Sequence, residues 1–87
     1  EIIIIDDNSI DGTIDTVKSL LKQNDNLKLN IRINKKKNLA ESINLGIKLA
    51  KYENIIWMDA DFQHPPKYIE EFIKKADQYD AVIHCEP

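Results

Sequence analysis

The spacing of hydrophobic positions changes along the chain and predicts which segments are strands. Residues 2–5 are consecutive isoleucines, a β-branched run without polar alternation that is typical of a strand buried on both faces of a parallel sheet. Residues 27–33 alternate apolar and polar side chains, which indicates a half-exposed strand at a sheet edge. Further apolar runs at residues 54–58 and 81–84 predict two more strands.

Helical patterns separate these strands. Apolar residues recur at helical spacing in residues 13–23 and 39–51, and a third helix is expected to start at Pro65 or Pro66. Asp11 or Thr13 is expected to cap the first helix. The predicted buried faces are Ile14, Val17, Leu20 and Leu21, then Ala40, Ile43, Gly46, Ile47 and Ala50, and then Ile69, Phe72, Ile73 and Ala76. Gly46 is expected to let its helix approach the sheet closely.

The resulting order is β-α-β-α-β-α-β, which predicts an α/β fold with an open parallel sheet and right-handed crossovers. At 87 residues the chain is one domain at most. It begins directly in a predicted strand and ends as another finishes, so we expect residues 1–87 to be part of a longer protein.

Composition narrows the function. The formal net charge of −3 argues against a general binder of nucleic acid, and the cluster Lys35–Lys37 is interpreted as a solvated loop. Cys85 is the single cysteine, which excludes an intramolecular disulfide. No apolar run approaches the roughly 18 residues of a membrane span.

Two acidic clusters follow predicted strands. Asp6 and Asp7 end the isoleucine run, and Asp59 and Asp61 follow residues 54–58. Residues i and i+2 of extended backbone point to the same side, so Asp59 and Asp61 are expected to face one space. Like charges held together call for a cation or a donor-rich ligand between them. Because ligands bind beyond the carboxyl ends of parallel strands, these clusters are the candidate site.

Other polar residues near the clusters have simpler interpretations. Asn8, Ser9 and Asp11 suit turn and cap positions, His64 is interpreted as a loop histidine, and Trp57 as a core residue. The chain has no glycine-rich phosphate loop. A diphosphate would therefore have to be held by a carboxylate-bound metal rather than by a glycine cradle. Gln63 is a neutral oxygen donor close to the acidic pair, and its sequence position leaves open a contact with either a cation or a diphosphate.

The motifs resemble those of the family 2 glycosyltransferases, which have the GT-A fold, a Rossmann-like α/β fold. Residues 4–13, Ile-Ile-Asp-Asp-Asn-Ser-Ile-Asp-Gly-Thr, are similar to the strand-end motif DDxSxDGT of that family. Asp59-Ala60-Asp61 resembles its DxD metal motif. Residues 58–66, Met-Asp-Ala-Asp-Phe-Gln-His-Pro-Pro, look most like the polyprenyl (dolichyl) phosphate sugar transferases within the family.

The resemblance implies a metal-dependent inverting glycosyltransferase that moves a sugar from a GDP- or UDP-sugar to a polyprenyl or dolichyl phosphate at the cytoplasmic face of a membrane. It implies that Asp6 and the Ile4 backbone contact the base and ribose, and that Asp7 also belongs to the nucleotide-sugar site. The second part of that site would be Asp59, Ala60 and Asp61. Asp59, Asp61 and Gln63 would hold Mg²⁺ or Mn²⁺.

By the same resemblance, residues 1–87 are the nucleotide-binding half of the catalytic domain. The first strand of the family, which lies between the strands at 2–5 and 54–58, would precede Glu1. The acceptor half and the catalytic base would follow Pro87. We expect no turnover by this part of the protein alone.

Alternatives remain open at the level of sequence. A family 2 transferase can use a saccharide acceptor for a cell-surface polysaccharide, and a non-catalytic nucleotide-binding relative is also compatible with the motifs. A phosphorylation-dependent signalling receiver is an alternative of another class, with Asp6 and Asp7 on Mg²⁺ and Asp59 as phospho-acceptor. That scheme leaves Asp61 and the Asp11-Gly12-Thr13 turn unexplained.

Overall fold

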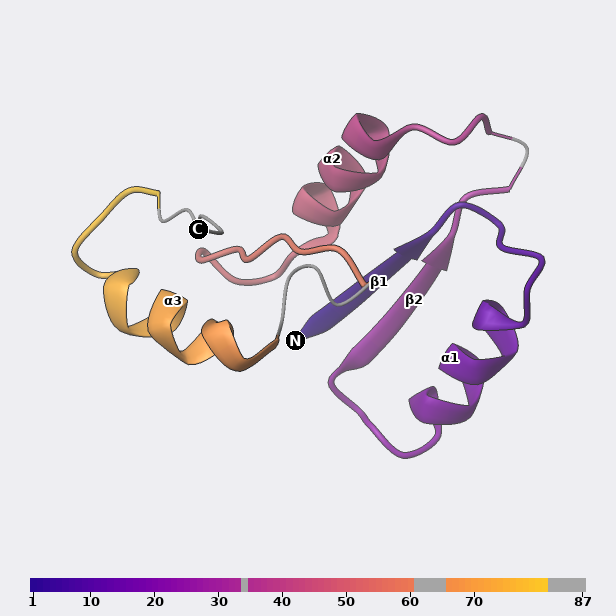
Figure 1. Ribbon diagram of the computed structural model, residues 1–87, viewed down its shortest axis with the longest axis horizontal. Helices are drawn as coiled ribbons and strands as arrows, with labels where there is room; N and C mark the ends of the chain where they lie inside the picture. The colour runs from indigo at the N-terminus through magenta and orange to yellow at the C-terminus, as the bar shows by residue number, and fades with distance from the viewer. Residues whose placement is uncertain (34, 61–65, 82–87) are drawn as a thin grey trace. The chain divides into compact units, whose positions relative to one another are not determined.

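The computed structural model describes residues 1–33, 35–60 and 66–81 (Figure 1). The chain divides into two compact units, Glu1–Glu53 and Asn54–Pro87. The elements in chain order are β1 (Ile2–Asp6), α1 (Thr13–Leu21), β2 (Leu27–Ile31), α2 (Leu39–Leu49), the 3-10 helix η1 (Pro66–Tyr68) and α3 (Ile69–Lys75).

The first unit is built on a parallel strand pair. β1 and β2 run side by side in one direction (Figure 1), with Ile2 opposite Leu27 and Asp6 opposite Ile31. The backbone N–H of Arg32 donates to the carbonyl oxygen of Asp6 at 2.7 Å, which continues the pairing past the end of β2. The predicted α/β class with parallel strands joined through a helix is confirmed.

Each helix of this unit packs on one strand. α2 contacts β1 and α1 contacts β2, as Figure 1 shows. Val17 of α1 is buried, with Ile14 and Leu21 half-buried around it, so this part of the predicted face is confirmed. Ile43 of α2 and its C-cap residue Ala50 are half-buried.

Several residues predicted to be buried are exposed, namely Leu20, Ala40, Ile47 and, in the second unit, Ile73 and Trp57. Strands lie only about 4.8 Å apart, so the described strand pair gives its helices a narrow surface to cover. Each helix therefore buries only those positions that face a strand directly. Trp57, predicted in the core, is 50% exposed.

The starts of the helices follow from local hydrogen bonds. Oδ1 of Asp11 accepts from the backbone N–H of Thr13 at 3.2 Å and from its hydroxyl, while Gly12 takes the left-handed backbone (φ 90°) that precedes α1. Asp11 thus closes the turn before α1. The predicted cap is wrong, because the N-cap residue is Gly12 and no side chain caps this helix. At α2, the side chain of Asn38 accepts from the N–H of Glu41 at 3.1 Å, a typical N-cap.

Gly46 lies where α2 approaches β1, but the approach does not require a glycine. A Cβ at this position would lie 3.7 Å from Cγ1 of Ile5, an ordinary contact. Since glycine in a helix interior costs about 1 kcal/mol relative to alanine, we expect Gly46→Ala to raise the free energy of unfolding of the full-length protein by about 0.5–1 kcal/mol.

Urea unfolding monitored by circular dichroism measures this gain. Gly12→Ala is the matched control and should destabilise, because its backbone is left-handed. A loss of stability in Gly46→Ala would show that the helix cannot accept the added methyl group.

One of the strands predicted for the second unit does not form. Residues 54–60 form no strand, because no described segment pairs with them in a hydrogen-bonded ladder. The third helix does follow Pro66, as predicted, and Ile69, Phe72 and Ala76 are half-buried. The predicted strand at 81–84 falls beyond the described residues except for Ala81, which is in no strand.

None of the helices in the described ranges is both long and apolar enough to cross a bilayer.

Candidate functional site

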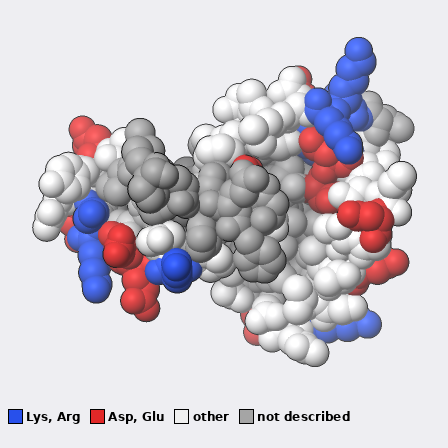
Figure 2. Space-filling view, viewed as in Figure 1, with Lys and Arg blue, Asp and Glu red and all other residues white. Residues whose placement is uncertain are grey.

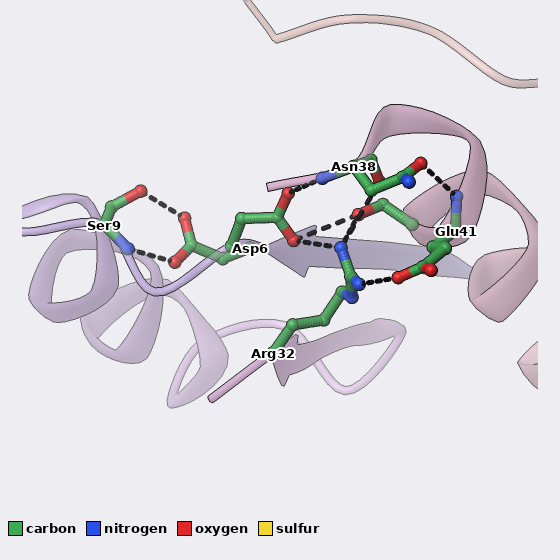
Figure 3. A network of polar contacts seen from close by, with 7 residues as sticks. Asp6, Ser9, Arg32, Asn38 and Glu41 are labelled. Atoms are coloured by element: carbon green, nitrogen blue, oxygen red, sulfur yellow. Dashed lines mark hydrogen bonds and ion pairs between the residues drawn. The ribbon is translucent and has the colours of Figure 1, made fainter. Parts of the chain in front are cut away.

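Asp6, the last residue of β1, has its carboxylate fixed within its own loop. It is 7% exposed. Its Oδ2 accepts from the backbone N–H of Ser9 at 2.7 Å, and its Oδ1 accepts from the Ser9 hydroxyl at 2.6 Å (Figure 3). Asn8 takes a left-handed backbone (φ 61°) inside this turn, which Asn tolerates better than most residues. The sequence DDNS thus folds back on the first carboxylate.

The carboxylate of Asp7 is directed to the other side, toward β2 and α2. Its Oδ1 accepts from Nη1 of Arg32 at 2.8 Å and from the Ser42 hydroxyl at 3.0 Å. Its Oδ2 accepts from the backbone N–H of Asn38 at 3.4 Å. The neighbouring carboxylates Asp6 and Asp7 therefore belong to separate hydrogen-bond groups, which relieves the repulsion between them.

Arg32 is the centre of the second group, and the sequence did not point to it. It is 8% exposed. Besides Asp7, its Nη1 donates to the backbone carbonyl of Asn38 at 3.2 Å and to Oγ of Ser42 at 2.9 Å, and its Nη2 donates to Glu41 (Figure 3). It is the only arginine of the chain. An arginine directly after a strand, among many lysines, was the one available signal, since a rigid fork of donors suits a buried carboxylate cluster.

The environment of Asp7 changes its acidity. Burial raises the pKa of this carboxyl, but hydrogen bonds from Ser42 and Arg32 and the charge of Arg32 outweigh that effect, so the pKa of Asp7 is lowered from its ordinary value. A carboxyl with a lowered folded-state pKa stabilises the fold above its unfolded pKa, about 3.9, and loses that contribution as the pH falls through the folded value.

We therefore expect the wild-type protein to lose stability below about pH 4 more steeply than Asp7→Asn does. Urea unfolding of both proteins between neutral and acid pH measures the difference. Asp25→Asn, which alters an exposed turn carboxyl, is the control and should follow the wild-type curve. Parallel curves for wild type and Asp7→Asn would contradict the expectation.

Charged residues of both signs gather around this end of the first unit. Lys35–Lys37 are exposed in the loop between β2 and α2, and Figure 2 shows basic side chains there beside acidic ones. The pKa of Asp11 is lowered by hydrogen bonds from Thr13 and, to a smaller extent, by the charge of Lys37. The charge of Lys37 therefore acts on one carboxyl of the acidic loop, that of Asp11.

The structure describes only some of the other site residues that the sequence predicted. Ile4 is half-buried in the middle of β1, opposite Leu29. Asp59 is half-buried and Ala60 is exposed, whereas Asp61, Gln63, His64 and Cys85 lie outside the described residues. Within the described ranges, no group of three or more His, Cys, Asp or Glu residues forms a metal-binding cluster. The oxygen donors of Asp59, Asp61 and Gln63 are nevertheless the type that Mg²⁺ and Mn²⁺ prefer.

The parallel pair, the acidic loop at its carboxyl end and the sequence motifs agree with one family. The family model described as glycosyl transferase family 2 matches residues 1–86, and the chain belongs to that family. The match favours a transferase over the signalling receiver that the acidic residues alone would allow.

The chain is also similar to curated proteins whose names give a lipid phosphate. The chain is 37% identical over 73 residues to a dolichol-phosphate mannosyltransferase of Mycosarcoma maydis, covering 84% of this chain and 24% of the relative. It is 35% identical over 74 residues to the dolichol-phosphate mannosyltransferase of Saccharomyces cerevisiae, covering 85% and 27%. An undecaprenyl-phosphate 4-deoxy-4-formamido-L-arabinose transferase of Aeromonas hydrophila is 31% identical over 83 residues, covering 94% and 26%.

The chain thus spans about a quarter of the length of these relatives. No solved structure matches it.

Proposed function

We propose that the protein containing this chain transfers a sugar from a nucleotide-diphosphate sugar to a polyprenyl phosphate. The observation that carries the proposal is the family match over residues 1–86, together with relatives named for a dolichol-phosphate or undecaprenyl-phosphate substrate. Both substrates are long isoprenoid lipids that end in a phosphate. The relatives differ in the sugar that their names give, so the shared chemistry is the lipid phosphate.

The donor is proposed to be a GDP- or UDP-sugar bound at the carboxyl end of β1. Asp6 and the backbone of Ile4 would contact its base and ribose, with Asp7 beside them. The position of Asp6 and Asp7 supports this role, because ligands of parallel α/β sheets bind beyond the carboxyl ends of strands. A carboxylate held still by Ser9 offers oxygens in one fixed orientation, which favours hydrogen bonds to ring N–H and hydroxyl groups.

Asp59, Asp61 and Gln63 are proposed to hold Mg²⁺ or Mn²⁺ against the diphosphate of the donor, with Ala60 between the two carboxylates. A bound divalent cation would neutralise the charge that develops on the departing nucleotide diphosphate. The donor chemistry supports the assignment, since two carboxylates and an amide oxygen match the preference of these hard cations. The chain has no glycine-rich loop or P-loop lysine that would do the same work.

The acceptor would be the phosphate oxygen of the lipid, which attacks the anomeric carbon as the nucleotide diphosphate leaves, with inversion. Because a polyprenyl chain is held in a bilayer, this reaction takes place at a membrane surface, and we propose the cytoplasmic face. The base and the acceptor-binding groups are proposed to lie outside residues 1–87.

A transfer assay with the full-length protein tests the acceptor class. Purified protein is given GDP- or UDP-sugars with MgCl₂ or MnCl₂, and either dolichyl or undecaprenyl phosphate in detergent or an oligosaccharide. We expect a lipid-linked sugar phosphate, identified by mass spectrometry, and no glycosylated oligosaccharide. Transfer to the oligosaccharide alone would replace the proposed acceptor by a saccharide, and phosphorylation of Asp59 by acetyl phosphate would support a receiver.

A further inference from the structure

We propose that Arg32 is a positioning residue for the nucleotide-diphosphate donor, acting through the main chain of Asp6 and the carboxylate of Asp7 at the end of β1; this inference rests on the proposed function. Arg32 contacts each member of the pair by a different group. Its backbone N–H donates to the carbonyl oxygen of Asp6 at 2.7 Å, and its Nη1 donates to Oδ1 of Asp7 at 2.8 Å. One residue thus fixes the main chain at Asp6 and the side chain at Asp7.

The same guanidinium joins this pair to the start of α2. Nη1 reaches the carbonyl oxygen of Asn38 at 3.2 Å and Oγ of Ser42 at 2.9 Å, while Nη2 reaches Glu41. Ser42 in turn donates its hydroxyl hydrogen to Asp7 at 3.0 Å, which closes a ring of contacts. The loop after β1 and the first turn of α2 are therefore held together through one side chain, as Figure 3 shows.

The two carboxylates differ in whether a positive charge neutralises them. The Arg32 side chain is 7% exposed and neutralises Asp7, whose side chain is 24% exposed. Both oxygens of Asp7 are occupied by Arg32, Ser42 and Asn38. Asp6 has no ion pair among the described residues. Asp7 accordingly acts as an anchor whose charge Arg32 neutralises. Asp6 accepts hydrogen bonds from Ser9 at both oxygens but keeps its charge without a counter-charge among the described residues, and a carboxylate oxygen can accept a second hydrogen bond. We therefore assign the contact with the donor to Asp6, whose main chain Arg32 fixes.

A lysine would not reproduce this arrangement. Arginine presents several donors in a rigid planar fork, whereas the lysine ammonium is a single point on a flexible stem. Arg32→Lys would keep the charge near Asp7 but could not serve Asp7, Asn38 and Glu41 at once. We therefore expect a graded loss of donor affinity, in which the affinity of Arg32→Lys lies between those of the wild-type protein and Arg32→Met.

The test measures binding of GDP and UDP, with MgCl₂, to the full-length protein by calorimetry, and the donor KM and acceptor KM in transfer. We expect Arg32→Met to weaken nucleotide binding and to raise the donor KM by roughly tenfold or more, by analogy with the effect of removing the hydrogen-bond partner of a metal ligand. The acceptor KM should stay unchanged. Arg32→Met combined with Asp7→Asn should bind little worse than Arg32→Met alone, because the two act as one unit.

Lys28→Met is the matched control. Lys28 lies on β2 and pairs with Glu1, the residue before β1, at 2.9 Å, at the opposite end of the sheet from Arg32, so its loss should leave nucleotide binding unchanged. If Arg32→Met binds GDP or UDP as tightly as the wild-type protein does, the inference about Arg32 is overturned and the proposed function still stands. A kcat that falls with the folded fraction while the donor KM is constant also overturns it, since that is a purely structural role. A wild-type protein that binds neither nucleotide overturns the inference together with the proposed function.

Discussion

Asp61→Ala in the full-length protein is expected to lower kcat/KM for sugar transfer by about a thousandfold. The reason is electrostatic: a divalent cation contributes several kcal/mol to stabilising charge on a departing diphosphate, and each 1.36 kcal/mol is a factor of ten in rate. Asp59→Asn should have an effect of the same order, because both carboxylates are proposed to hold the same ion. Gln63→Ala should cost less, since it removes a neutral donor.

Transfer rates measured against MgCl₂ and MnCl₂ concentration, and in EDTA, check this expectation. Asp77→Ala removes an exposed carboxylate just after α3 and serves as the control, with wild-type activity expected. A wild-type protein that remains active in EDTA, together with an unaffected Asp61→Ala, would contradict the metal role of these residues while leaving the family assignment intact.

Arg32→Met is expected to destabilise the protein by about 1–3 kcal/mol, the cost of leaving hydrogen-bonding groups without their charged partner. Asp7 and Ser42 would both lose their contact to Nη1, and the carbonyl of Asn38 would lose a donor. The expected loss of stability is smaller than for a fully buried ion pair because the side chain of Asp7 is 24% exposed. The loss should be largest above the unfolded pKa of Asp7, where the carboxylate is charged.

Urea unfolding at neutral pH provides the measurement. Lys28→Met breaks the ion pair between β2 and Glu1, the residue before β1. The side chain of Lys28 is 45% exposed and that of Glu1 10%, and ion pairs with an exposed partner contribute little. Equal losses in the two variants would show that the Arg32 group adds nothing beyond an ordinary surface ion pair.

Local sequence patterns were sufficient for the first unit of the fold. The isoleucine run, the alternation in residues 27–33 and the periodic segments gave β1, β2, α1 and α2 close to their observed bounds. The apolar run at 54–58 suggested a strand, but a strand also requires a partner for its backbone, and no described segment supplies one to these residues. The prediction that Ile47 and Trp57 are buried was wrong for a related reason, since the pattern of apolar residues does not show which segment covers them.

The candidate site was predicted in part. The position of Asp6 and Asp7 at the end of β1 followed from their place after an apolar run, and the turn role of Asp11 followed from its neighbours. The role of Arg32 could not be predicted because it depends on Asp7, which is 25 residues away in sequence. Such contacts arise from the parallel register of β1 and β2, which no local pattern specifies.

We propose that this chain supplies the donor-nucleotide site of a polyprenyl-phosphate glycosyltransferase. Amide hydrogen exchange of the full-length protein, followed by mass spectrometry with and without GDP or UDP and MgCl₂, tests it most directly. We expect slower exchange on nucleotide binding in residues 4–13 and in residues 58–63, with little change in residues 69–75. Nucleotide binding that leaves exchange in residues 4–13 and 58–63 unchanged would contradict it.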